Sequence, residues 1–335
     1  MDLKRIFLKD ACPTSIGGQA VLEGIMMRGP KKTAVAIRLP GDKIHMRTTE
    51  NKQPGKWTKI PLVRGVVSFV SSLVVGTSTL MYSADIVEQT WEEEDPQEPS
   101  KFEKWFEKTF GAKALWNLLV YISVILSLVI SIGVFVLLPT AIIGWLDGII
   151  KSGFVLNLIE GFFRLLLFIA YVAAIAGMKD IKTVYQYHGA EHKTIHCFEK
   201  GLELTPDNAQ SFYTLHPRCG TSFLMFVMVI AILLFSCLGW PNLFWRIVSR
   251  LALIPVIAGL SYELLKWAGR SDNIVVKILS MPGLWLQKLT TKEPTNEQLE
   301  VAICAMKAVL PDNEDPCFEG LCDKNGKQIV EQAEV

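Results

Sequence analysis

The feature that most constrains this chain is a run without any charged residue, from Ala114 to Gly144. About 20 consecutive apolar residues are enough to cross the hydrocarbon core of a bilayer as a helix. Core helices of soluble domains seldom hold a run of this length, so the chain is predicted to be a membrane protein. Hydrophobic residues make up 50% of the 335 residues, which agrees with this class. Three further runs of spanning length cover about 153–178, 221–238 and 247–267.

The distribution of basic residues predicts the orientation of these spans. Short turns at 145–152 and 239–244 join the first two and the last two spans. Lys and Arg are almost absent from both turns, whereas they abound in the N-terminal segment, in 179–220 and in 266–292. Because cytoplasmic loops carry the excess of Lys and Arg, the large segments are predicted to be cytoplasmic. The expected location is the cell membrane, with a multi-pass topology.

The apolar run at 62–84 is rich in Ser, Gly and Thr and is predicted not to cross the membrane. A full crossing would place the many Lys and Arg residues before it outside, against the charge rule. A re-entrant or interfacial helix buried against the bundle is therefore expected. Residues 91–113 combine an acidic run with an aromatic stripe and are predicted to form another interfacial helix.

The N-terminal 60 residues are predicted to be β-rich. Alternating runs at 33–39 and 43–49 flank Pro40-Gly41-Asp42, a pattern typical of a hairpin. The predicted fold is an all-α membrane helix bundle of about four spans plus one re-entrant or interfacial helix, with a small cytoplasmic β-rich segment. The predicted segments are 1–60, the β-rich segment; 61–113, the re-entrant or interfacial helices and acidic linker; 114–178, the first transmembrane hairpin; 179–220, a cytoplasmic segment with the candidate metal site; 221–267, the second hairpin; and 268–335, an interfacial helix, a soluble helix and a mobile tail.

Four of the five histidines lie in two short segments of the predicted cytoplasmic part. The first segment carries His188, His192 and His196, which share one helix face at i, i+4 and i+8. Glu191 lies at the edge of this face and completes a His-x-x-Glu-His motif. In metal-dependent hydrolases with this arrangement, two imidazoles one turn apart bind the metal and the carboxylate handles the proton of a water molecule. Glu191 is therefore the candidate catalytic base.

Two histidines are too few for tight metal binding, so a third ligand must come from elsewhere. His216 and Cys219 are the best placed, because His-Pro-Arg-Cys precedes the third span and returns to the same membrane face. Glu263, on the inner part of the fourth span, is another candidate, since a carboxylate near hydrocarbon is costly unless it binds a cation or a partner. The mixed nitrogen and sulfur ligands favour Zn²⁺.

Several of these residues have alternative interpretations. His196 is a ligand, a donor to a ligand or a surface residue. Cys219 is a ligand, a nucleophile or a small buried side chain, and Arg218 would lower its pKa in the first two cases. Glu191 could form an ordinary helical ion pair, and the histidines could simply lie at the membrane surface. Glu23 could reach the site from the N-terminal segment, although its spacing does not require this.

Three motifs together resemble the YqhQ-like family of bacterial membrane proteins. They are the glycine-punctuated stretch 17–29, His188-Gly189-Ala190-Glu191-His192-Lys193 and His216-Pro217-Arg218-Cys219-Gly220-Thr221. The resemblance extends from about residue 16 to 310. It implies a bacterial inner-membrane protein, a predicted metal-dependent enzyme of unknown substrate with the metal at His188 and His192.

The function predicted from these residues is a zinc-dependent hydrolase at the cytoplasmic face, acting on a membrane-protein segment or a lipid-linked molecule. The expected partners are the bilayer and such a substrate; the net charge of +1 and the absence of a basic–aromatic pattern argue against nucleic acid. A second hypothesis is a non-catalytic assembly or ion-handling factor with a structural metal. A di-iron oxygenase is disfavoured, because four histidines are too few unless carboxylates such as Glu199 substitute.

Overall fold

The computed structural model describes residues 6–7, 11–52, 55, 58, 60–91, 112–268, 273–311, 313 and 315–329. Most of the interfacial helix expected at 91–113 lies outside these residues. The chain divides into two compact units. The first comprises Met1–Trp91, Tyr171–Ile230 and Leu251–Val335, and the second comprises Glu92–Ala170 and Ala231–Arg250.

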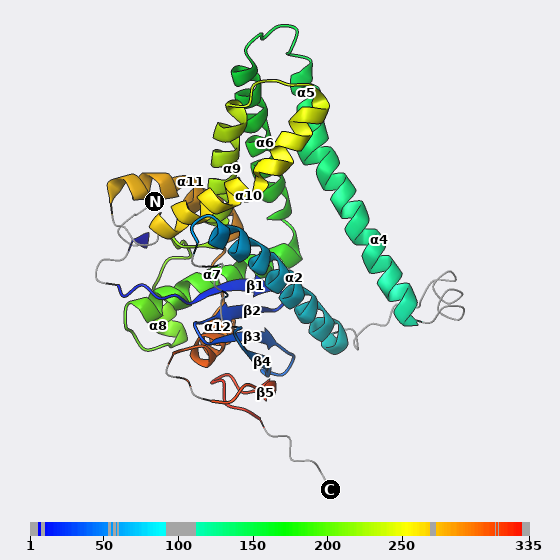
Figure 1. Cartoon of the computed structure of the whole chain (residues 1–335). Coiled ribbons are helices and arrows are strands. Elements are labelled where there is room, and N and C mark those ends of the chain that lie inside the picture. The colour runs from blue at the N-terminus through cyan, green and yellow to red at the C-terminus, as the bar shows by residue number, and fades with distance from the viewer. Residues whose placement is uncertain are drawn as a thin grey trace. The chain divides into compact units, whose positions relative to one another are not determined.

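The first unit is built on a five-stranded antiparallel sheet (Figure 1). Its strands, in spatial order, are β1 (Gly17–Val21), β2 (Gly24–Arg28), β3 (Lys32–Arg38), β4 (Ile44–Glu50) and β5 (Glu319–Cys322). The predicted hairpin is confirmed as β3 and β4, with Gly41 and Asp42 at positive φ in its turn. Strand β5 comes from the tail that we expected to be mobile. It pairs with β4 and so covers an edge that would otherwise expose unpaired backbone groups.

Helices pack on both faces of this sheet. The helices that lie wholly in the first unit are α2 (Val63–Trp91), α7 (Lys179–Glu199), α8 (Pro206–Gln210), α11 (Ile274–Thr290) and α12 (Asn296–Ala308). In β2, Ile25 and Met27 belong to the core formed with α7 and α12, whereas Met26 belongs to the core formed with α2. Successive side chains of a strand point to opposite faces, so one strand supplies both cores.

The helix that carries the histidines, α7, ends at a glycine. Gly201 adopts a φ of +70°, and its N–H and that of Leu202 donate to carbonyls of the last turn of α7. Helix α12 begins with a capping box. Thr295 accepts a hydrogen bond from the Gln298 backbone, and the Gln298 side chain accepts one from the Thr295 backbone.

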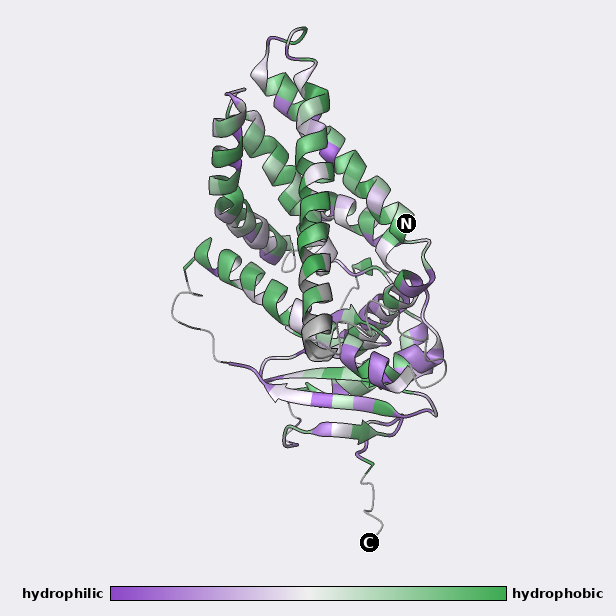
Figure 2. Ribbon diagram, turned by 90° about the vertical axis from the view of Figure 1, so that its right-hand side faces the viewer, coloured by the Kyte–Doolittle hydropathy of each residue, from purple (hydrophilic) through white to green (hydrophobic). Residues whose placement is uncertain are grey.

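Four of the described helices are long and apolar enough to cross a membrane: Val63–Thr90, Ile125–Gly144, Gly153–Ile175 and Phe244–Ala268. The sequence also predicts four membrane spans, but not the same four segments. The expected third span appears as α9 (Gly220–Ser236), whose 17 residues are at the lower end of the length that crosses a bilayer. The run at 62–84 instead forms the 29-residue α2, one face of which packs on the sheet. Figure 2 shows long helices that are hydrophobic over most of their length and strands of mixed character.

The second unit contains an ion-pair cluster among apolar helices. Its elements are α4 (Ala112–Ile132), a π-helical turn (Gly133–Leu137), α5 (Leu138–Gly144) and most of α6 (Gly153–Ile175); α9 and α10 (Leu243–Ala268) contribute residues to both units. Glu160 is fully buried and pairs with Arg164 one turn later and with Arg250 at 2.8 Å. A buried carboxylate among apolar helices is stabilised by such partners.

Candidate metal centre

The chain after α11 crosses α7 at the turn that carries His188. The Lys292 N–H donates to the Tyr185 carbonyl at 2.9 Å. Gly189 permits this approach, because a Cβ there would lie only 2.0 Å from the Lys292 carbonyl oxygen. The Lys292 backbone occupies the space that a side chain at residue 189 would need. Residues distant in sequence thereby reach the histidine face of α7.

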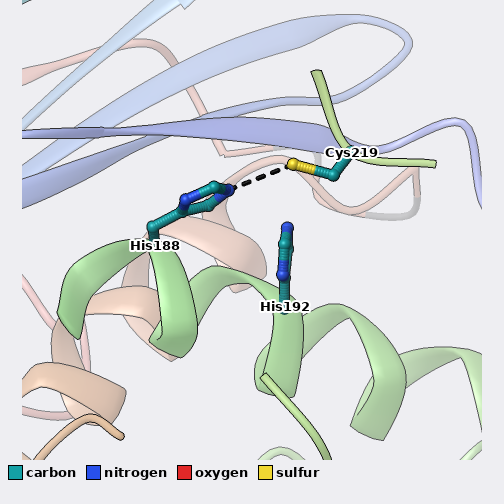
Figure 3. Close-up of side chains that lie close together, drawn as sticks. All are labelled: His188, His192 and Cys219. Carbon is teal, nitrogen blue, oxygen red and sulfur yellow. Dashed lines mark hydrogen bonds between the residues drawn. The ribbon is translucent and has the colours of Figure 1, made fainter. Parts of the chain in front are cut away.

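His188 and His192 project from successive turns of α7 toward the Cys219 thiol (Figure 3). Nε2 of His188 lies 3.1 Å from Sγ of Cys219. One ligand atom from each of the three residues lies within 4.8 Å of the others. Tetrahedral zinc with Zn–N near 2.0 Å and Zn–S near 2.3 Å separates its donor atoms by roughly 3.3–3.7 Å. Side-chain shifts of about 1 Å would therefore close this set around a cation.

Backbone carbonyls determine which imidazole nitrogen faces the site. Nδ1 of His188 lies 2.8 Å from the Thr290 carbonyl oxygen, and Nδ1 of His192 lies 2.5 Å from that of Thr214. A carbonyl oxygen only accepts, so each neutral ring holds its proton on Nδ1 and keeps the lone pair on Nε2. Nε2 of His192 is buried without a hydrogen-bond partner. Metal-binding histidines donate their other N–H in this way, so the residues fit a divalent cation.

Neighbouring groups lower the pKa of the Cys219 thiol. Sγ lies 3.2 Å from Oγ1 of Thr221 and accepts its backbone N–H at 3.4 Å. Burial raises the pKa of Cys219, but the neighbouring His192 imidazole and the Thr221 hydrogen bonds outweigh it, so the pKa lies below its ordinary value. We expected Arg218 to have this effect; its guanidinium instead pairs with Glu199.

Glu191 is buried beside this donor set. Its Oε1 accepts the Gly18 backbone N–H of β1 at 2.9 Å. Burial raises the pKa of Glu191 to about 7, against the opposing effects of His188 and the Gly18 hydrogen bond. The alternative of a helical ion pair with Lys193 is not found, because that ammonium binds a carboxylate oxygen of Glu293 at 2.8 Å.

His216 lies with a second group of donor atoms. One ligand atom from each of His196, Glu199 and His216 lies within 4.8 Å of the others. Of the third ligands that the sequence left open, His216, Cys219 and Glu263, the structure places Cys219 with His188 and His192. Arg218 contacts the second group through its pair with Glu199.

The two remaining candidates lie in neither group of donor atoms. Glu263 forms a two-point ion pair with Arg64 of α2, with Oε1 2.6 Å from Nε. Glu23 occupies the turn between β1 and β2 at a φ of +47°, and its carbonyl accepts the Arg38 N–H. Burial raises the pKa of the Glu23 carboxyl group.

Comparison with known proteins places the chain in a family. Residues 60–312 match the family model described as protein of unknown function (DUF1385). The chain belongs to the DUF1385 family. A curated protein of Bacillus subtilis (strain 168), uncharacterized protein YqhQ, is 35% identical over 327 residues, covering 95% of this chain and 98% of that protein. The predicted resemblance to the YqhQ-like family is confirmed. No solved structure matches the chain.

The matched DUF1385 region contains several site residues that carry no chemical signature in the sequence. Gln287 of α11 donates to the His216 carbonyl at 2.9 Å and accepts its N–H at 2.8 Å. The carbonyls of Thr214 and Thr290 orient the two imidazoles, and any residue type has a carbonyl. Glu199 is different: it lies three residues after His196 on the same helix, a spacing that places both on one face.

Acidification is expected to destabilise the metal-free DUF1385 protein. Burial lowers the pKa of His192 from 6.5 to about 4. Between these values the unfolded chain binds a proton that the folded chain does not, so stability falls as the pH drops, by about 1.4 kcal/mol per pH unit for one fully shifted group. The pKa values of His196 and His216 are also lowered. The pKa of Glu191 is raised from 4.5 to about 7, so this group stabilises the folded chain as the pH drops. The pKa of His45 is also lowered and that of Glu23 is also raised, so four histidines oppose two carboxylates, and the net effect is expected to follow the histidines.

The melting temperature of the detergent-purified, metal-free protein between pH 7 and pH 5 measures this effect. His192→Asn should flatten the fall, because its amide can still donate to Thr214 but takes up no proton. A melting temperature that stays constant or rises toward pH 5 would contradict the predicted loss of stability.

Proposed function

We propose that this protein is a membrane-embedded, zinc-dependent hydrolase with the metal held by His188, His192 and Cys219. One observation carries the proposal: both imidazoles donate Nδ1–H to backbone carbonyls and direct Nε2 toward one buried thiol. Three protein ligands leave a fourth coordination position for water or substrate, which is typical of catalytic rather than closed structural zinc sites.

Glu191 is the proton acceptor in this proposal. A bound zinc ion would supply a Lewis acid that acidifies water and polarises a carbonyl group. The Gly18 N–H holds Oε1 of Glu191, so the other carboxylate oxygen would accept the proton. In the metal-free protein, burial raises the pKa of Glu191 to about 7, so this carboxylate is a stronger base than an exposed one. A group that first accepts a proton and then donates it to a leaving group works best in this range.

The proposed substrate is a membrane-protein segment or a lipid-linked molecule that reaches the site at the cytoplasmic face of the cell membrane. Four described helices of membrane-crossing length and the excess of Lys and Arg in the large segments support this location. Helix α2 leaves Val70, Leu73 and Val74 exposed by 51%, 54% and 64%. An interfacial α2 would bury these side chains in lipid, which agrees with the sequence prediction for 62–84.

A non-catalytic factor with a structural metal is the second candidate function. The burial of the site favours it, because His192 and Cys219 are only 1% and 7% exposed. Structural metal sites are closed and stabilise the fold directly, without a proton acceptor. The role of Glu191 separates the two functions.

The hydrolase and the non-catalytic factor both require a bound metal, so the metal content of the protein tests both. Wild-type protein, purified and exchanged into metal-free buffer, is expected to retain about one equivalent of zinc by elemental analysis, and His188→Ala/His192→Ala less than about a tenth of that. His45→Gln is the matched control, because the fifth histidine lies on β4 and bonds to Tyr82 at 2.6 Å. Equal metal in wild type and the double variant would remove the basis for the proposal.

A further inference from the structure

The four clustered histidines do not converge on a single point. Their rings form a chain, with centroid distances of 4.5 Å from His188 to His192, 5.5 Å from His192 to His216 and 4.6 Å from His216 to His196. The first two belong to the site described above. The last two share a separate group of donor atoms with Glu199.

Two nitrogens of this second group are buried without a hydrogen-bond partner: Nδ1 of His196 and Nε2 of His216. The residues are 1% and 4% exposed. Nε2 of His196 lies 3.0 Å from the Leu215 carbonyl and donates to it, so Nδ1 holds a lone pair without a donor. A buried polar atom without a partner is destabilising, and a cation could bind the lone pair of this nitrogen.

Glu199 supplies the third donor. Its Oε1 accepts the Thr14 N–H at 2.8 Å and the Arg218 guanidinium. Its Oε2 faces Nε2 of His216 at 3.7 Å. Carboxylates that bind metals are commonly oriented in this way, by hydrogen bonds to the oxygen that does not bind.

We propose that His196, Glu199 and His216 form a second divalent-cation site, so that this face of α7 holds a pair of metal ions. The site uses none of the donor atoms of the first site, and it does not require that the protein hydrolyses a substrate. Two imidazole nitrogens and one carboxylate oxygen suit zinc and neighbouring first-row divalent metals.

The second site binds its cation more weakly than the first. The Arg218 guanidinium places a positive charge beside it, whereas the first site contributes a thiolate. Nδ1 of His216 also accepts the Arg218 backbone N–H at 3.3 Å. A cation on Nε2 moves the ring proton to Nδ1 and breaks this weak bond. The two sites therefore fill in order. The first cation binds at His188, His192 and Cys219, and the second at His196, Glu199 and His216.

Titration of metal-free, full-length protein with Co²⁺ tests the proposal. The first equivalent is expected to produce the near-ultraviolet charge-transfer band of a cobalt–thiolate bond, and the second only the weaker visible bands of nitrogen and oxygen ligands. In His196→Gln the amide can still donate to Leu215 but Nδ1 is absent. This variant should bind about one equivalent with the thiolate band intact, which also shows that it folds.

Two controls complete the experiment. Glu199→Gln should weaken the second equivalent by about tenfold or more, because the amide lacks the charge of the carboxylate. His45→Gln should bind both equivalents. A wild type that saturates at one equivalent, or a His196→Gln protein that still binds two, overturns the second site. Two equivalents without a thiolate band would instead refute the first site and with it the proposed zinc ligands.

Discussion

Glu191→Gln is expected to lower hydrolysis by about 10²–10⁴-fold while leaving the zinc content unchanged. The amide has nearly the same shape as the carboxylate, and its oxygen can still accept the Gly18 N–H that now holds Oε1 at 2.9 Å. It cannot accept a proton, so only the base function is lost. The measurement uses purified protein in proteoliposomes with two probes, a phospholipid ester and an apolar membrane-spanning peptide, and mass spectrometry of the products.

Glu293→Gln is the matched control for this variant. Glu293 is a carboxylate next to the site region, but its side chain is 70% exposed and pairs with Lys193. Its substitution should change turnover by less than about twofold, because the Glu293 carboxylate is exposed and the Lys193 ammonium keeps its hydrogen bond to the Gln210 carbonyl at 2.8 Å. Equal turnover by wild type and Glu191→Gln would refute the role of Glu191 and favour a structural metal.

Gly189→Ala is expected to destabilise the protein by about 3 kcal/mol or more and to weaken metal binding. The new Cβ would lie 2.0 Å from the Lys292 carbonyl oxygen and 3.3 Å from Cγ2 of Thr214. A backbone carbonyl cannot rotate away as a side chain does, so the chain after α11 must shift. That shift also moves the Thr290 carbonyl away from Nδ1 of His188.

The melting temperature and the zinc content of this variant test both effects. Gly177→Ala is the matched control, because the nearest heavy atom to a Cβ there is 3.6 Å away, an ordinary contact. A Gly189→Ala protein that melts with the wild type would show that the crossing between α7 and Lys292 is not as tight as the structure has it.

The local part of this protein could be predicted from spacing alone. The i, i+4 rule places His188 and His192 on one helix face, and Gly201 marks the end of that helix. The hairpin of β3 and β4 follows from alternation around a Gly-Asp turn. The apolar runs similarly predict helices of membrane-crossing length. All of these patterns depend on residues within a few positions of one another.

The packing of α2 on the sheet and the addition of β5 depend on tertiary structure. Tertiary structure also decides whether His216 or Cys219 lies beside His188 and His192, because both residues precede α9 at a similar distance along the chain.

The orientation of the imidazoles likewise depends on contacts between segments far apart in sequence. Nδ1 of His188 meets the carbonyl of a residue 102 positions away. Local sequence sets backbone conformation and which side chains share a face. Long-range packing sets which atoms meet, and a backbone carbonyl carries no residue-specific signal that would reveal the meeting in advance.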